Sequence, residues 1–126
     1  MKKMIIAITI LAVILTAGIL ESIFVEKTFV ELNGRLEIVI QYIVDDNVEA
    51  ALKSNNDTIE WWEGKRHSME MFTFSPDLRL LSVSLGESKG SLECGDMKSA
   101  LSKTESILNI SNNLREILNF NLQDII

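Results

Sequence analysis

The side chains in this sequence that are best spaced for metal binding lie around its single histidine. Glu63, His67 and Glu70 follow one another at i, i+4 and i+7, which places them on one face of a helix. Imidazole and carboxylate groups together can bind a transition metal. A di-iron helical bundle, however, needs a Glu-x-x-His motif on each of two helices, and this chain has one His-x-x-Glu in the reverse order. We interpret the three residues as a solvated charged face and expect neither a metal nor a cofactor.

The only cysteine, Cys94, cannot form a disulfide within the chain. A catalytic pair of Cys94 and His67 would need two distant segments to converge and a third group to orient the histidine. The sequence also lacks a nucleophile elbow, a phosphate-binding loop and a zinc signature. We therefore predict that the protein is not an enzyme. We expect Cys94 to be a free thiol, with a bridge to a second chain in an oxidising compartment as the alternative.

Two adjacent tryptophans are the most informative aromatic residues. Neighbouring residues on a helix point about 100° apart, so Trp61 and Trp62 do not both face a core. Trp62 continues an apolar stripe and should be buried. Trp61 is expected to be partly exposed, either as a contact for a protein partner or as a cover over the shoulder of the bundle. Trp61 is therefore our candidate partner-contact residue.

The longest apolar run lies at the N-terminus, where Met4–Leu20 contains no charged residue. A helix of that length is about 25 Å long, near the lower limit for a hydrocarbon core of about 30 Å. Lys2 and Lys3 precede the run and predict a cytoplasmic N-terminus. We predict a single-pass anchor in the cell membrane, with residues 4–20 in the lipid bilayer and residues 21–126 as an extracytoplasmic domain. The alternative is a signal peptide cleaved after the small residues Thr16-Ala17-Gly18.

A second pattern predicts the helix that follows the anchor. Apolar residues spaced 4, 3, 4, 3 and 4 apart form a stripe of the heptad type, consisting of Val25, Phe29, Leu32, Leu36, Val39 and Ile43. The stripe begins almost where the N-terminal run ends. We therefore expect one continuous helix from the membrane to about Val44.

Short polar turns divide the remaining residues into further helices. After Asp45 the pattern breaks, and we expect Asp46 to cap a second helix together with Glu49. Ser75-Pro76-Asp77 suits the start of a third helix, and Asp96 should cap a fourth. The Asn55-Asn56-Asp57-Thr58 segment could kink the second helix, which we nevertheless expect to be continuous.

These elements predict an all-α fold, in which an N-terminal transmembrane helix continues into an antiparallel up-down bundle of about four helices. Residues 1–20 would form the anchor and residues 21–126 the bundle. An up-down arrangement returns the last helix toward the membrane, so Phe120 and Ile125-Ile126 should lie near its surface.

Charge excludes one class of partner. The chain has 12 basic and 18 acidic residues, a net charge of −6. Two of the basic residues, Lys2 and Lys3, precede the anchor, so residues 21–126 carry 10 basic and 18 acidic groups, a net charge of −8. So acidic a domain repels phosphate backbones, and we expect no binding to nucleic acid.

The chain resembles a family of small bacterial membrane-anchored proteins, domain of unknown function 4363, along nearly its whole length. The segments that carry the resemblance are Met1-Lys2-Lys3, Phe29-x-x-Leu32, Trp62-Glu63-x-Lys65-Arg66, Met69-x-Met71-Phe72 and Met97-x-x-Ala100-Leu101. The chain departs from the family at Gly64, Gly86, Gly90 and Ser75-Pro76, which puts the continuity of the second and third helices in question. The resemblance implies a bacterial, Gram-positive origin and no activity, because the family has none assigned.

Together these features predict a membrane-anchored interaction or scaffold module of the bacterial cell envelope. It would act through an unidentified protein partner or through self-association. The alternative is a ligand-sensing helical bundle. Because only Met1-Lys2-Lys3 would lie in the cytoplasm, such a sensor would have to signal through a membrane partner.

Overall fold

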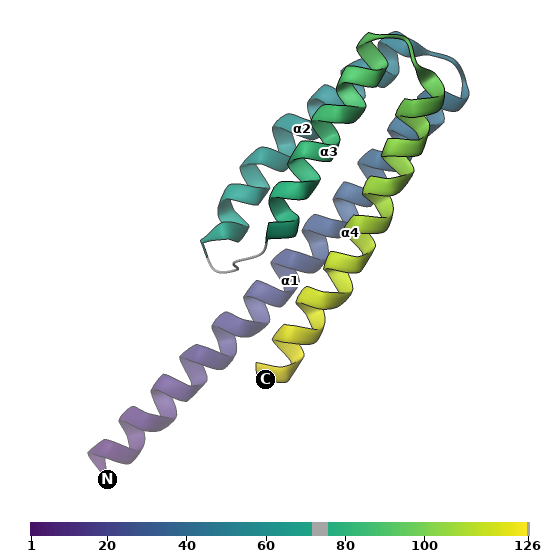
Figure 1. Cartoon of the computed structure of the whole chain (residues 1–126). Helices are drawn as coiled ribbons and strands as arrows, with labels where there is room; N and C mark the ends of the chain where they lie inside the picture. Colours follow the sequence, from purple (N-terminus) through teal and green to yellow (C-terminus); the bar gives the residue numbers. More distant parts are fainter. Residues whose placement is uncertain (72–75, 126) are drawn as a thin grey trace.

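The computed structural model describes residues 1–71 and 76–125, with side chains described as far as residue 117. The regular elements in these ranges are the helices α1 (Lys2–Val44), α2 (Val48–Glu70), α3 (Pro76–Glu93) and α4 (Met97–Ile125). Figure 1 shows them side by side as a bundle, from which the N-terminal half of α1 projects. The predicted all-α bundle of four helices is confirmed.

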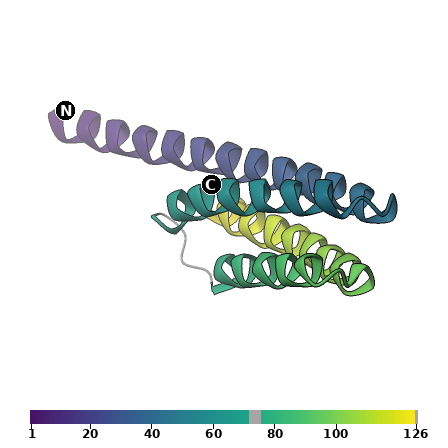
Figure 2. The ribbon, with the colours of Figure 1, turned by 90° about the horizontal axis from the view of Figure 1, so that it is seen from above.

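Each helix of the bundle packs against two others. Contacts join α1 to α2 and α4, and α3 to the same two helices. Consecutive helices run in opposite directions, so α4 returns along α1 toward its projecting half (Figures 1 and 2). This is the expected up-down topology. The side chains of Phe120 and Ile125, and the whole of Ile126, lie outside the described residues.

The first helix is continuous over 43 residues, which corresponds to about 65 Å. Its predicted stripe is buried, with at most 5% exposure at any member from Val25 to Ile43. Gly34 lies on the exposed side of this helix, where an added Cβ would meet nothing within 4 Å. The expected continuous helix from the apolar run to Val44 is therefore confirmed.

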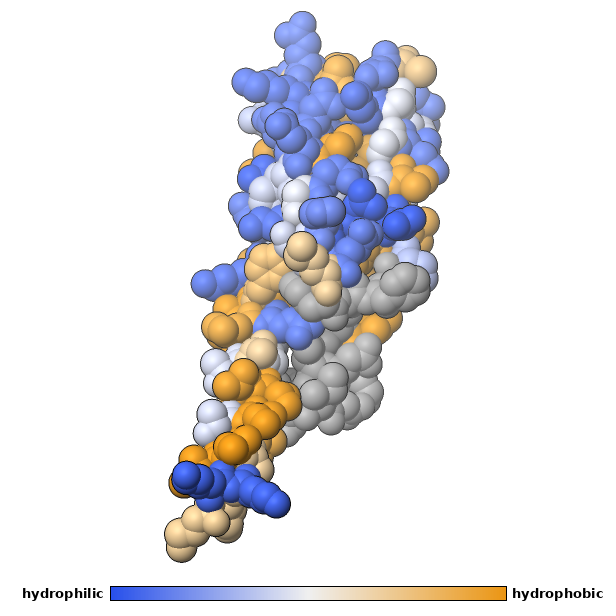
Figure 3. Space-filling model, turned by 90° about the vertical axis from the view of Figure 1, so that its left-hand side faces the viewer, coloured by the Kyte–Doolittle hydropathy of each residue, from blue (hydrophilic) through white to orange (hydrophobic). Residues whose placement is uncertain are grey.

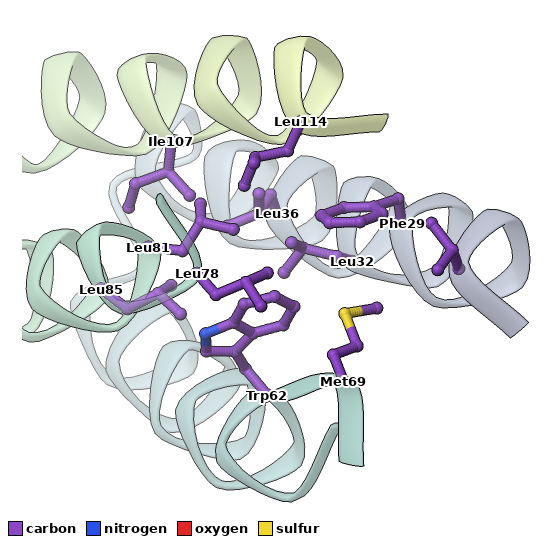
Figure 4. Packing of buried hydrophobic residues seen from close by; sticks show 11 residues of the cluster. Phe29, Leu32, Leu36, Trp62, Met69, Leu78, Leu81, Leu85, Ile107 and Leu114 are labelled. Carbon is purple, nitrogen blue, oxygen red and sulfur yellow. The ribbon is translucent and has the colours of Figure 1, made fainter. Parts of the chain in front are cut away.

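The larger core cluster forms in the half of the bundle nearer the projecting part of α1. Trp62 is fully buried there, and its ring centroid lies 6.1 Å from that of Phe29 at a tilt of 49° (Figure 4). The indole N–H of Trp62 donates a hydrogen bond of 3.0 Å to Ser82 Oγ, so the buried polar atom is satisfied. A smaller cluster at the far end comprises Val39, Ile43, Ala51, Leu92 and Ala100.

The turns at the far end of the bundle have the same geometry, and one of them corrects our prediction. Asp46, not a glycine, has a positive φ of 59°, and its amide bonds to Ile43 O while the next amide bonds to Tyr42 O. This is a Schellman motif. The expected N-cap at Asp46 is wrong, because its left-handed backbone closes α1. Asn47 caps α2 instead, and its side chain accepts a hydrogen bond from Ala50 N at 3.2 Å.

The turn between α3 and α4 repeats this arrangement. Gly95 has a φ of 75° and closes α3 with two amide bonds of the same type, to Leu92 O and, from the next residue, to Ser91 O. Asp96 then accepts a hydrogen bond from Ser99 N at 3.1 Å. The predicted cap at Asp96 is confirmed. At the other end of α3, Pro76 is the first helical residue as expected, whereas Ser75 lies outside the described residues.

The polar segment inside α2 does not interrupt the helix. Asn55 is buried, and its Nδ2 donates to Leu85 O of α3 at 3.5 Å. Thr58 is also buried, and its hydroxyl donates to Ser54 O at 2.8 Å. The helix α2 thus stays continuous with polar side chains on its inner face, although Asn55 Oδ1 is buried without a hydrogen-bond partner among the described residues.

Candidate interaction surfaces

On the face of α2 that carries Glu63, His67 and Glu70, Arg66 pairs with both glutamates. Arg66 lies between the two glutamates: its Nε donates to Glu63 Oε2 at 3.1 Å, and its Nη1 lies 3.5 Å from Glu70 Oε1. Nε of Arg79, on α3, also lies 3.6 Å from Glu70 Oε1. His67 is exposed. Within residues 1–71 and 76–125, no three histidine, cysteine or acidic residues are grouped to hold a metal ion. The face is thus a network of ion pairs.

Cys94 lies in the turn between α3 and α4, at the far end of the bundle, and is exposed. His67 lies 19 residues along α2 from that end, or about 28 Å. The two side chains are therefore too far apart to act together as nucleophile and base. Cys94 is an isolated, accessible thiol.

Trp61 lies at the edge of α2 that faces α1. It is partly buried against the larger core cluster, and Cζ of Arg35 lies 4.8 Å from its ring centroid. This cation–π contact covers one face of the ring. The geometry matches a tryptophan that covers the shoulder of the bundle. Its role as a partner contact stays a prediction.

The projecting half of α1 is the most exposed apolar surface in the described chain. Its most apolar 18-residue window has a mean hydropathy of 2.5, and none of that window is buried. α1 is thus long and apolar enough to cross a membrane. Figure 3 shows apolar colour concentrated on this half of α1 and hydrophilic colour at the far end of the bundle.

Polar atoms within the apolar run are satisfied inside the helix. The hydroxyls of Thr9 and Thr16 donate to Ile5 O and Ala12 O, each at 2.8 Å. The run therefore presents no unpaired hydroxyl to a lipid environment, where such a group would be costly.

Two polar seams fix the register of α4. Against α1, Arg115 Nε donates to Glu26 Oε2 at 3.0 Å, and its Nη2 pairs with the other carboxylate oxygen. Asn33 donates to Asn112 Oδ1 and accepts from Ser111 Oγ, both at 2.8 Å. The Glu26 hydrogen bond raises the pKa of Arg115, against a smaller lowering by burial.

The second seam joins α3 to α4. The hydroxyls of Ser88 and Thr104 are 3.1 Å apart, and those of Ser91 and Ser99 are 3.2 Å apart. Lys103 Nζ also donates to Ser91 Oγ at 3.1 Å. Ser88 and Thr104 continue the apolar spacing of their helices, so the pattern indicates their burial, but it does not reveal which hydroxyl pairs with which.

Comparison with known proteins adds no identification: no family model, curated protein or solved structure matches the chain. The resemblance to domain of unknown function 4363 stays a prediction.

Proposed function

We propose that the protein is a membrane-anchored helical interaction or scaffold module of the bacterial cell envelope, with no catalytic activity. One observation carries the proposal: the unburied apolar run and the first helix of the bundle belong to the same continuous helix. An apolar surface of this length in water would be strongly unfavourable, and a bilayer removes the cost.

The direction of insertion follows from charge. Lys2 and Lys3 flank the N-terminal end of the run, which favours a cytoplasmic N-terminus and an extracytoplasmic bundle. The acidic bundle gains little from anionic lipid headgroups, so the apolar run supplies most of the attachment.

The polar side chains of the bundle support an interaction role, because they pair with one another inside the bundle. The charged residues around His67 pair with one another, and the buried hydroxyls and amides of the seams join helices. These groups stabilise the bundle and leave its surface for contact with a protein partner or a second copy. Trp61 covers the edge of the core, and because its ring is only partly buried it also stays our candidate residue for such a contact.

A charge in the middle of the run tests the anchor. Leu11→Asp should cost about 2.5–3.5 kcal/mol of insertion free energy and release the protein from the membrane fraction. Leu11→Ile is the matched control and should stay in the membranes after extraction at alkaline pH. The intact mass should include residues 1–20. A membrane-bound Leu11→Asp protein, or a mature chain beginning near Ile19, would contradict the proposal.

A further inference from the structure

Four large apolar side chains remain exposed at the end of the bundle that adjoins the projecting half of α1. Ile23 on α1 and Leu80 on α3 are each 46% exposed, Ile117 on α4 is 51% exposed, and Met71 at the end of α2 is 80% exposed. Three of them lie on α1, α3 and α4, and Met71 directly follows α2. We call these four residues the rim. If the bundle stood clear of the membrane, the rim would be hydrated at a free-energy cost.

Contacts between α4 and α1 give the position of Ile117 along the axis of the bundle. Arg115 pairs with Glu26, and Ile117 lies two residues further toward the end of α4. Because the helices are antiparallel, Ile117 comes level with about Phe24 on α1. Ile117 therefore lies at about the same height as Ile23.

The heights of the other two rim residues follow from α2. Lys65 Nζ lies 5.5 Å from the ring centroid of Phe24, and Met71 is six residues further toward the anchor. Leu80 follows Arg79, which contacts Glu70 in the last turn of α2. Along the axis of the bundle, Met71 therefore lies level with Phe24 or nearer the anchor. Leu80 lies slightly farther from the anchor than Phe24.

The thickness of the bilayer places the headgroup layer at the same position along α1. A hydrocarbon core of about 30 Å needs about 20 helical residues. Counted from Met4, such a span ends at Ile23, three residues beyond the uncharged run. Headgroups add about 5–7 Å on each side, or about four more residues of α1. The headgroup layer therefore covers the stretch of α1 beside which the rim lies.

We propose that the rim is seated in the headgroup layer of the leaflet into which α1 emerges, so that its partner is the lipid bilayer. The inference rests on the proposed anchor and deepens it. The helix of α4 continues eight residues past Ile117, about 12 Å, alongside α1 toward the N-terminal end of that helix. The bundle is thus held at two places, by the anchor and by its rim.

Lipid quenching of single labelled cysteines tests this contact in the full chain. In a Cys94→Ser background, cysteines replace Met71, Ile117, Ile10 or Val44 one at a time and carry an environment-sensitive fluorophore. The protein is reconstituted in phosphatidylcholine vesicles without spin label, with lipid that is spin-labelled near the headgroup, or with lipid that is spin-labelled in the middle of the acyl chain. Val44 is the matched control, because it is 63% exposed and lies at the far end of the bundle.

The proposal predicts loss of fluorescence at Met71 and Ile117 by the lipid labelled near the headgroup, with no loss at Val44. If Ile10 is quenched but Met71 and Ile117 are not quenched, as expected for Val44, the rim contact is overturned and the anchor is left intact. A blue-shifted but unquenched rim would mean that protein covers it, which also overturns the proposal. Absence of quenching at Ile10 by the lipid labelled in the acyl chain would refute the anchor, and the rim contact with it.

Discussion

Trp61 and Trp62 show how one step along a helix changes the role of a side chain. Trp62 is fully buried with its N–H bonded to Ser82, whereas Trp61 is partly buried beneath Arg35. The apolar stripe predicted the burial of Trp62. It did not reveal Arg35, which lies 26 residues earlier and comes over the Trp61 ring only once α1 and α2 pack.

The two tryptophans should therefore differ in their contributions to stability. Trp62→Ala should lower the free energy of unfolding by about 3–5 kcal/mol, because it leaves a large cavity. Trp61→Ala should cost about 1 kcal/mol, the usual loss for a partly exposed site. Chemical denaturation of the full chain in detergent micelles, followed by helical circular dichroism, measures both. Equal losses would show that the assignment of core and cover is wrong.

Two glycines form a matched pair that differs only in backbone conformation. An added Cβ would meet nothing within 4 Å at either Gly34 or Gly95, but only Gly95 has a positive φ. Gly95→Ala should lower the free energy of unfolding by about 1–2 kcal/mol, because a side chain disfavours the left-handed region. Gly34→Ala should raise it by up to about 1 kcal/mol through helix propensity. The same denaturation assay checks both signs, and a shared sign would contradict the turn geometry.

At the scale of elements, the helices could be predicted well and their mutual contacts poorly. The stripe from Val25 to Ile43 predicted the bundle part of α1, because burial at heptad spacing is a periodic property. The first cap was assigned to Asp46 instead of Asn47, because both residue types suit a cap and the choice depends on which one takes the left-handed backbone. The buried seam residues Ser88, Thr104 and Ser111 continue the apolar spacing, but no local pattern identifies their hydrogen-bond partners on the neighbouring helix.

The seam between α1 and α4 is testable through its ion pair. A double-mutant cycle with Glu26→Gln and Arg115→Gln should give a coupling free energy of about 0.5–1 kcal/mol, since both side chains are over one-third exposed and solvent screens them. Salt should reduce the coupling. Because Glu26 raises the pKa of Arg115, the guanidinium is fully charged at neutral pH, and its contribution falls as pH rises through strongly alkaline values. A coupling near zero at low salt would contradict the pairing.

At the scale of the whole molecule, one long helix links the apolar run to the bundle without a hinge. The division into residues 1–20 and residues 21–126 therefore describes two environments along a single rod, and it stays a prediction. Because α1 is continuous through the boundary, the bundle should keep a fixed orientation relative to the bilayer. A rod of this kind suits a scaffold, since it presents the same surfaces to a partner at a constant height.

The side of the membrane on which the bundle lies is the central claim, and the protein carries its own reporter for it. Cys94 is the only cysteine and is exposed in the turn farthest from the anchor. A membrane-impermeant maleimide applied to intact cells should label Cys94, whereas a Cys94→Ser, Lys3→Cys variant should be labelled only after lysis. Labelling of Cys94 only after lysis, with Lys3→Cys accessible from outside, would contradict the account.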